Sequence, residues 1–178
     1  MRDELAWTHP VMVADLPERG IDLELVPEET NRASLARHAG VLAVPRLLAR
    51  LNLVPDGRGG AMVEGTLEAT VRQACVVSLE PFEQAIVEPI SQRFVPAERL
   101  TSDRAGAIDA GQVGAPDPLI GGKIDLAAVV AEFLALAIDP YPRKPGAVFI
   151  PPPESEAAGR PTAFAALEKL KAGKDKKG

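Results

Sequence analysis

Apolar and polar residues alternate most clearly between residues 46 and 95. From Ala61 to Cys75 the odd-numbered positions are mostly apolar, and the even-numbered ones are mostly polar or charged. This period of two is typical of strands with one face buried. The same alternation covers residues 46–53, and a further strand is expected over residues 82–95, where Pro89 favours an edge position or a bulge. The pattern predicts an antiparallel meander of at least three strands.

Shorter patterns flank the meander. Strands are expected over residues 7–15 and 21–26, and a helix over 28–38 with its acids first and its bases last. Residues 126–138 are nearly all apolar, and Asp125 precedes them as an N-cap, so a helix is expected that is either buried or half buried against a partner. A last short strand is expected over residues 147–150.

These elements predict an α+β fold, in which an antiparallel β-sheet, open or partly closed into a barrel, packs against one or two helices. Residues 1–150 are expected to form a single domain with a long flexible loop at 97–123, because that segment is rich in Gly and Pro. Residues 151–160 are predicted to be a linker. Residues 161–178 are predicted to form a short C-terminal helix and a basic tail.

Charge and composition narrow the function classes. The formal net charge is −5, although five lysines and one aspartate lie in the last ten residues, so the rest of the chain is strongly acidic. Such a body is a poor general surface for nucleic acid. Cys75 is the single cysteine and there are two histidines, which excludes an internal disulfide and the common zinc sites. No long apolar run or signal peptide is evident, which predicts a cytoplasmic protein.

Few residues are candidates for chemistry. Cys75 lies in phase with the apolar face of its strand, so a buried structural role is expected. Tyr141, Arg143 and Lys144 cluster in a proline-rich loop that either contacts a phosphate backbone or partner, or is only a rigid connector. The further candidates for RNA or partner contact are the tail lysines, and an apolar side of the last helix is a candidate protein-docking face: Lys169, Lys171, Lys174, Lys176, Lys177; Phe164, Leu167, Leu170.

Four segments, taken in order, resemble one known family. They are residues 75–82, 124–132, 139–146 and 164–170. Together they resemble the YceD-like family of large ribosomal RNA subunit accumulation proteins, in its alphaproteobacterial form. The resemblance implies a role in accumulation of large-subunit ribosomal RNA and no enzymatic activity. Many members carry Cys-x-x-Cys where this chain has Cys75 and Ser78, so neither a metal nor another cofactor is expected here.

Sequence and resemblance together predict a non-enzymatic ribosome-biogenesis factor. It would act by binding a large-subunit ribosomal RNA precursor, or a ribosomal or assembly protein, without contacting DNA or a membrane. The alternative is a small acidic protein–protein adaptor with no RNA role, which the acidic body favours.

Overall fold

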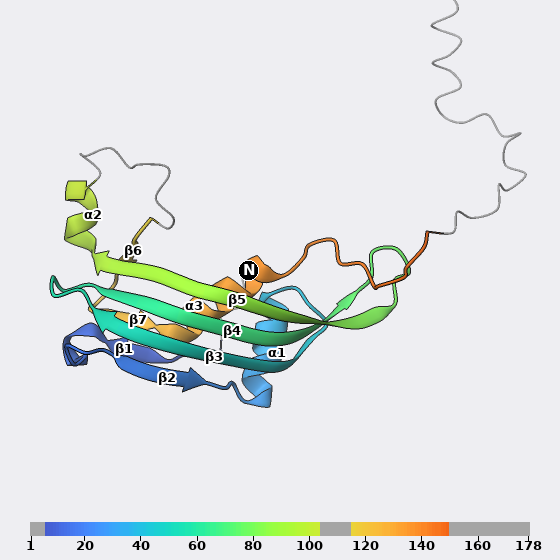
Figure 1. Ribbon diagram of the computed structural model, residues 1–178, viewed down its shortest axis with the longest axis horizontal. Coiled ribbons are helices and arrows are strands. Elements are labelled where there is room, and N and C mark those ends of the chain that lie inside the picture. Colours follow the sequence, from blue (N-terminus) through green and yellow to red (C-terminus); the bar gives the residue numbers. More distant parts are fainter. Residues whose placement is uncertain (1–5, 104–114, 150–178) are drawn as a thin grey trace, which may run out of the picture. The chain divides into compact units, whose positions relative to one another are not determined.

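The centre of the fold is a five-stranded sheet in the order β2-β3-β4-β5-β6 (Figure 1). The computed structural model describes residues 6–103 and 115–149 of the chain. The strands are β2 (Ile21–Leu25), β3 (Ala43–Pro55), β4 (Ala61–Ala74), β5 (Pro81–Pro96) and β6 (Asp117–Leu119). The first four are antiparallel neighbours, and β6 runs parallel to the end of β5. The α+β class is confirmed, and the sheet is open.

One face of this sheet forms the core, as the alternation predicts. Register places Leu51 of β3 beside Gly65 of β4, and Leu53 beside Val63. The odd-numbered side chains of β3 and β4 are therefore on one face, and most are fully buried. The even-numbered side chains lie on the other face, where Arg50 and Glu64 are exposed, Glu68 is half-buried and Leu48 is buried. The facing predicted for both strands is confirmed.

Two helices cover the buried face. Helix α1 (Glu29–His38) packs against β3, and helix α3 (Leu126–Ala137) packs against β4 and β5 (Figure 1). The Asp125 side chain caps α3 by accepting a hydrogen bond from the Ala127 N–H at 3.1 Å, as the sequence predicts. It also accepts one from the His9 N–H at 2.8 Å, which ties the N-terminal segment to this helix. The two helices begin and end close to their predicted residues.

Helix α3 is buried on one side only. Leu126, Val130 and Leu134 are completely buried, whereas Glu132 is exposed and Leu136 is 75% exposed. The apolar sequence alone does not distinguish a helix buried on all sides from one that leaves a stripe at the surface. Glu132 lies in the exposed stripe and therefore needs no buried partner.

The first strand and the loop after β5 differ from the sequence-based expectation. Strand β1 (Pro10–Met12) is short, pairs with β7 (Lys123–Asp125) outside the main sheet, and runs into a 3₁₀ turn (Val13–Asp15). The segment expected to be a loop at 97–123 contains helix α2 (Ala97–Asp103) and strand β6. Strand β6 forms because β5 offers it a backbone edge at Phe94–Pro96, a partner that local composition cannot reveal.

The remaining differences lie near the C-terminal side. Residues 147–149 form no strand, because Pro145 and Gly146 turn the chain and the Ala147 N–H bonds back to the Lys144 carbonyl at 3.0 Å. The described residues up to Ala147 belong to one compact unit. The predicted linker 151–160, the predicted C-terminal helix and tail 161–178, and residues 104–114 lie outside the described residues.

Pro89 occupies an edge, as predicted. Strand β5 pairs with β4 along its whole length, but β6 pairs only with Phe94–Pro96. In the described ranges, no strand covers the outer side of residues 81–93. Proline is tolerated there because its missing N–H would point away from the neighbouring strand.

Candidate functional site

The chain makes a tight turn between β4 and β5, at residues 75–80. The Cys75 N–H donates to the Glu80 carbonyl at 2.9 Å, and the Leu79 N–H donates to the Cys75 carbonyl at 2.8 Å. Leu79 adopts φ of 60°, a left-handed conformation that is uncommon for a branched residue, and its side chain is 79% exposed. These bonds fix the turn and hold the Cys75 side chain beneath it.

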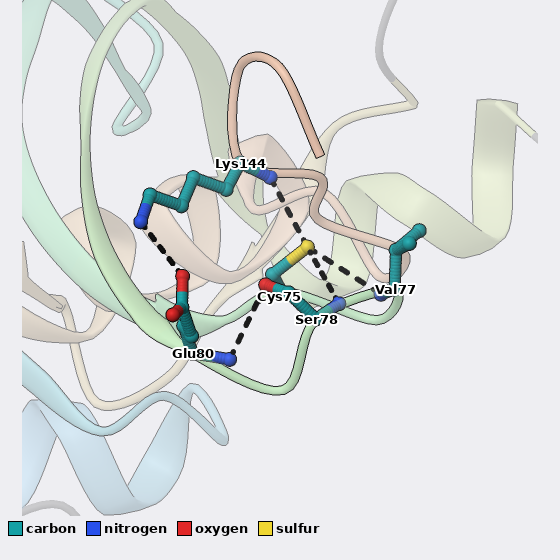
Figure 2. Close-up of polar contacts among 5 residues, drawn as sticks. All are labelled: Cys75, Val77, Ser78, Glu80 and Lys144. Atoms are coloured by element: carbon teal, nitrogen blue, oxygen red, sulfur yellow. Dashed lines mark hydrogen bonds and ion pairs between the residues drawn. The ribbon is translucent and has the colours of Figure 1, made fainter. Parts of the chain in front are cut away.

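The Cys75 sulfur accepts three backbone hydrogen bonds (Figure 2). The donors are the N–H groups of Val77 and Ser78, both at 3.4 Å, and that of Lys144 at 3.3 Å. The Ser78 side chain, together with these N–H groups, lowers the pKa of Cys75 to about 6 against the opposing effect of burial. The N–H groups that converge on the sulfur therefore favour its thiolate form over the neutral thiol.

The same turn anchors the proline-rich loop at residues 139–146. Besides the Lys144 N–H on Cys75, the Val76 N–H donates to the Pro142 carbonyl at 2.9 Å. The Gln73 amide nitrogen donates to the Asp139 carbonyl at 3.0 Å. Segments more than 60 residues apart in the sequence are thus joined by several hydrogen bonds. The loop is a rigid feature of the surface because both its backbone and its prolines are fixed.

The predicted contact residues of this loop have different environments. Tyr141 is 73% exposed, and Arg143 is exposed and makes no ion pair within the described residues. Lys144 pairs with Glu80 at 2.8 Å, a contact that raises the pKa of Lys144 and lowers that of Glu80 (Figure 2). The pair partly neutralises Lys144, so Arg143 is the cation of this loop best placed to meet an external group.

The loop and the beginning of β5 enclose a groove of about 660 Å³. Tyr141 and Arg143 line it on the loop side, and Glu83 and Ala85 line it on the strand side. The groove brings the predicted loop residues together with a strand edge that the sequence does not associate with them.

The other candidates fall outside the part of the chain that the structure describes. They are the tail lysines and the apolar side of the predicted last helix: Lys169, Lys171, Lys174, Lys176, Lys177; Phe164, Leu167, Leu170. Their roles in partner contact stay predictions.

The charge pattern on the open face of the sheet disfavours nucleic-acid binding. Arg50 pairs with Glu24 at 3.4 Å and with Glu68 at 2.8 Å, and Arg72 pairs with Glu83 at 2.6 Å. Phosphate binding would have to compete with these carboxylates. The outward-facing positions of β2 to β5 also carry no Phe, Tyr or Trp on which bases could stack.

The donor set at the Cys75 turn does not fit a zinc ion. A structural zinc site needs several thiolate, imidazole or carboxylate ligands, and Ser78 occupies the place of a second thiol in Cys-x-x-Cys. Within residues 6–103 and 115–149, no group of three or more His, Cys, Asp or Glu side chains is arranged to hold a metal. We expect untagged protein to contain no stoichiometric zinc, and elemental analysis finding it would contradict this expectation.

Sequence reasoning assigned Cys75 to the core but missed the hydrogen bonds of its sulfur. It also missed the role of Gln73, a polar residue among the apolar, core-facing positions of β4, whose exposed fraction is 7%. A polar residue in a buried register is a signal that a backbone group lies nearby, since buried polar groups need partners. That signal identifies Gln73, although it does not identify the loop that Gln73 holds.

Comparison with known proteins assigns a family. A family model described as "Large ribosomal RNA subunit accumulation protein YceD" matches residues 63–171, which include the turn, the β5 edge and the loop. Searches of the curated proteins and of the solved structures found no significant match. Among the described residues, no helix has both the length and the apolar character that a membrane crossing requires.

Proposed function

The chain belongs to the YceD family, the large ribosomal RNA subunit accumulation proteins, and from this membership we propose that it supports accumulation of that RNA by binding alone. It acts in the cytoplasm, catalyses no reaction, and binds a large-subunit precursor or a ribosomal or assembly protein. The observation that carries the proposal is the rigid loop at 139–146, which presents Tyr141 and Arg143 at the surface.

Charge supports recruitment through a protein. The net charge is −5, and two arginines of the open sheet face, Arg50 and Arg72, are already paired with carboxylates. A surface of this kind cannot hold bare RNA strongly, because affinity for the phosphate backbone depends on free cations. A partner protein therefore supplies most of the affinity, and Arg143, Lys144 and the tail lysines add short-range phosphate contacts.

The test is co-sedimentation with large-subunit precursors at two salt concentrations. Arg143→Glu is expected to weaken association without unfolding the protein, because Arg143 is exposed and the loop is held by other residues. Arg19→Glu is the matched control: it makes the same charge change in the exposed turn before β2, away from the loop. Deleting residues 174–178 should weaken association modestly.

The salt dependence separates contacts made through charged groups from an apolar protein contact. Three or four phosphate contacts would give a slope of about −2 to −4 in a plot of log affinity against log salt concentration. Association that is insensitive to salt and to Arg143→Glu would reject the phosphate contacts. Failure of the parent protein to associate with any ribosomal particle would reject the function and favour the acidic adaptor.

A further inference from the structure

Among the residues that the structure describes, no strand pairs with the outer edge of β5 at residues 81–93. The Cys75 N–H donates to the Glu80 carbonyl, so these two residues form a hydrogen-bonded pair. The next residues along the two strands, Ala74 and Pro81, lie opposite each other. Hydrogen-bonded and non-hydrogen-bonded pairs alternate in antiparallel strands. Even-numbered residues of β5 therefore bond to β4, and odd-numbered residues direct their N–H and C=O groups toward the outer edge.

Prolines limit where this edge can accept another strand. Pro81 and Pro89 are both odd-numbered, so each leaves a missing donor at the outer edge. Between them Glu83, Ala85 and Val87 offer N–H and C=O groups, and their side chains are exposed. The available edge is a short window, which is long enough for a peptide and too short for uncontrolled sheet growth.

The groove beside this window is already formed. Its far wall is Asp139, Tyr141, Arg143 and Pro145 of the anchored loop. Because hydrogen bonds to Val76, Cys75 and Gln73 hold that loop, a ligand would not have to order it. Binding to a wall that is fixed in advance avoids a conformational entropy cost.

The chemistry of the groove suits an extended peptide. Alternating N–H and C=O groups along one edge are matched by a second strand, in the manner of strand addition. The cations next to the groove are mostly paired, Arg72 with Glu83 and Lys144 with Glu80. Arg143 is left to meet an acidic side chain, and the Tyr141 ring offers an apolar surface.

We propose that this groove binds an extended segment of a protein partner, which adds as a strand to β5 at residues 83–87 and places an acidic side chain opposite Arg143. The inference deepens the proposed function, because it states what the protein partner presents, and it rests on that function for the class of partner. It assigns Arg143 to an acidic side chain of the partner, which leaves phosphate contacts to Lys144 and the tail lysines. RNA fits this groove less well, because Glu83, Asp139 and the outward carbonyl groups would face its phosphates.

A second copy of the chain also fits less well than a peptide. Self-pairing would be confined to the same short window between the prolines, and stable dimers bury about 800 Å² on each partner. A single peptide, in contrast, can use the edge and the loop wall of one groove together.

The experiment uses overlapping synthetic peptides that tile the large-subunit ribosomal proteins of the source organism. Peptides that bind the full chain on an array are then measured in solution by fluorescence anisotropy. Ala85→Pro removes an outward N–H within the window and is expected to lower affinity about tenfold or more. Ser91→Pro is the matched control, since it removes an outward N–H on the same edge beyond Pro89.

A second readout reports on the mode of binding. In amide hydrogen exchange followed by NMR, peptide should protect the N–H groups of Glu83, Ala85 and Val87. Those of Gln84 and Ile86 already bond to β4 and should change little. Arg143→Glu is expected to weaken the binding of acidic peptides selectively, and this loss of affinity should become smaller as the salt concentration is raised.

Several results would overturn the inference. It fails if no peptide on the array binds, or if Ala85→Pro and Ser91→Pro lose affinity equally. It also fails if an RNA oligonucleotide, and not a peptide, protects the N–H groups of Glu83, Ala85 and Val87. A concentration-dependent dimer that Ala85→Pro abolishes would overturn it as well. The proposed function is tested apart from it by precursor co-sedimentation. If Ala85→Pro co-sediments like the parent, the groove proposal fails and the function stands. If the parent does not co-sediment, the function fails even where peptides bind the groove.

Discussion

Replacing Val71 by aspartate tests the facing of the sheet most directly. Val71 is completely buried on the face covered by the helices, between its neighbours on β3 and β5. Its partner in register on β5 is Gln84, whose side chain could donate a hydrogen bond to a new carboxyl group. Thr70, the preceding residue, faces the opposite side and is opposite Arg46.

The magnitude follows from two losses. Removing a buried valine costs about 1.5 to 3 kcal/mol. Keeping the carboxyl group neutral at pH 7 requires its pKa to rise by about 3 units, which costs about 4 kcal/mol. A hydrogen bond from Gln84 returns about 1 kcal/mol. The net cost of about 5 kcal/mol equals the lower limit of domain stability, so Val71→Asp should be unfolded or nearly so.

Thr70→Asp should cost under about 1 kcal/mol, because it adds a carboxylate to an exposed face beside a cation. Val71→Ala, which should cost about 2 kcal/mol, keeps the comparison measurable if the aspartate variant does not fold. The assay is urea denaturation followed by the fluorescence of Trp7, the single tryptophan, which is in the core. Equal destabilisation by Val71→Asp and Thr70→Asp would refute the assigned faces.

Three further substitutions probe the turns and the sheet. The pKa of Cys75 in the folded protein, about 6, lies below its ordinary value of 9.0. The free energy of unfolding of Cys75→Ser should therefore fall further below that of the parent as pH rises from about 6 toward 9. A difference in urea denaturation that does not change with pH would indicate a neutral thiol. Burial raises the pKa of Asp56, but the N–H groups of Arg58 and Gly60 and the charges of Arg99 and Arg93 together lower it below 3.8. The advantage of the parent over Asp56→Asn should therefore disappear as pH falls below 3.8, and its persistence in acid would contradict this. Gly65→Ala should lower stability by about 1 to 3 kcal/mol, because the new Cβ would collide with the Arg50 carbonyl oxygen. Thr66→Ala is the control and should cost less. A urea midpoint of Gly65→Ala at or above that of Thr66→Ala would contradict this.

Much of the fold could be predicted because its information is local. The alternation in β3 and β4 fixes which side chains face the helices, and Asp125 marks the start of α3. Strand β6 and the pairing of β1 with β7 could not be predicted in this way. Each is three residues long, too short for a periodic signal, and each exists because a distant strand offers a backbone edge.

The candidate site was predictable in its residues and not in its geometry. Proline content identified the loop, and the exposed cation and ring at Arg143 and Tyr141 followed from residue type. The partners that matter are non-local: Lys144 meets Cys75 across 69 sequence positions and Glu80 across 64. Pairing of Lys144 with Glu80 changes which cation is available, and no local pattern encodes that pairing.

The Cys75 turn gives a physical reason why a chain with a single thiol can keep this loop rigid. The Cys75 sulfur accepts three backbone N–H groups and so satisfies donors that would otherwise lack partners. One of those donors is the Lys144 N–H, so this hydrogen bond holds the loop beside the β5 edge. The hydrogen bonds between the turn and the loop involve neither Arg143 nor the outward backbone groups of β5. These groups stay available to a binding partner. The loop is therefore held in position before a partner binds, which lowers the conformational entropy cost of binding one.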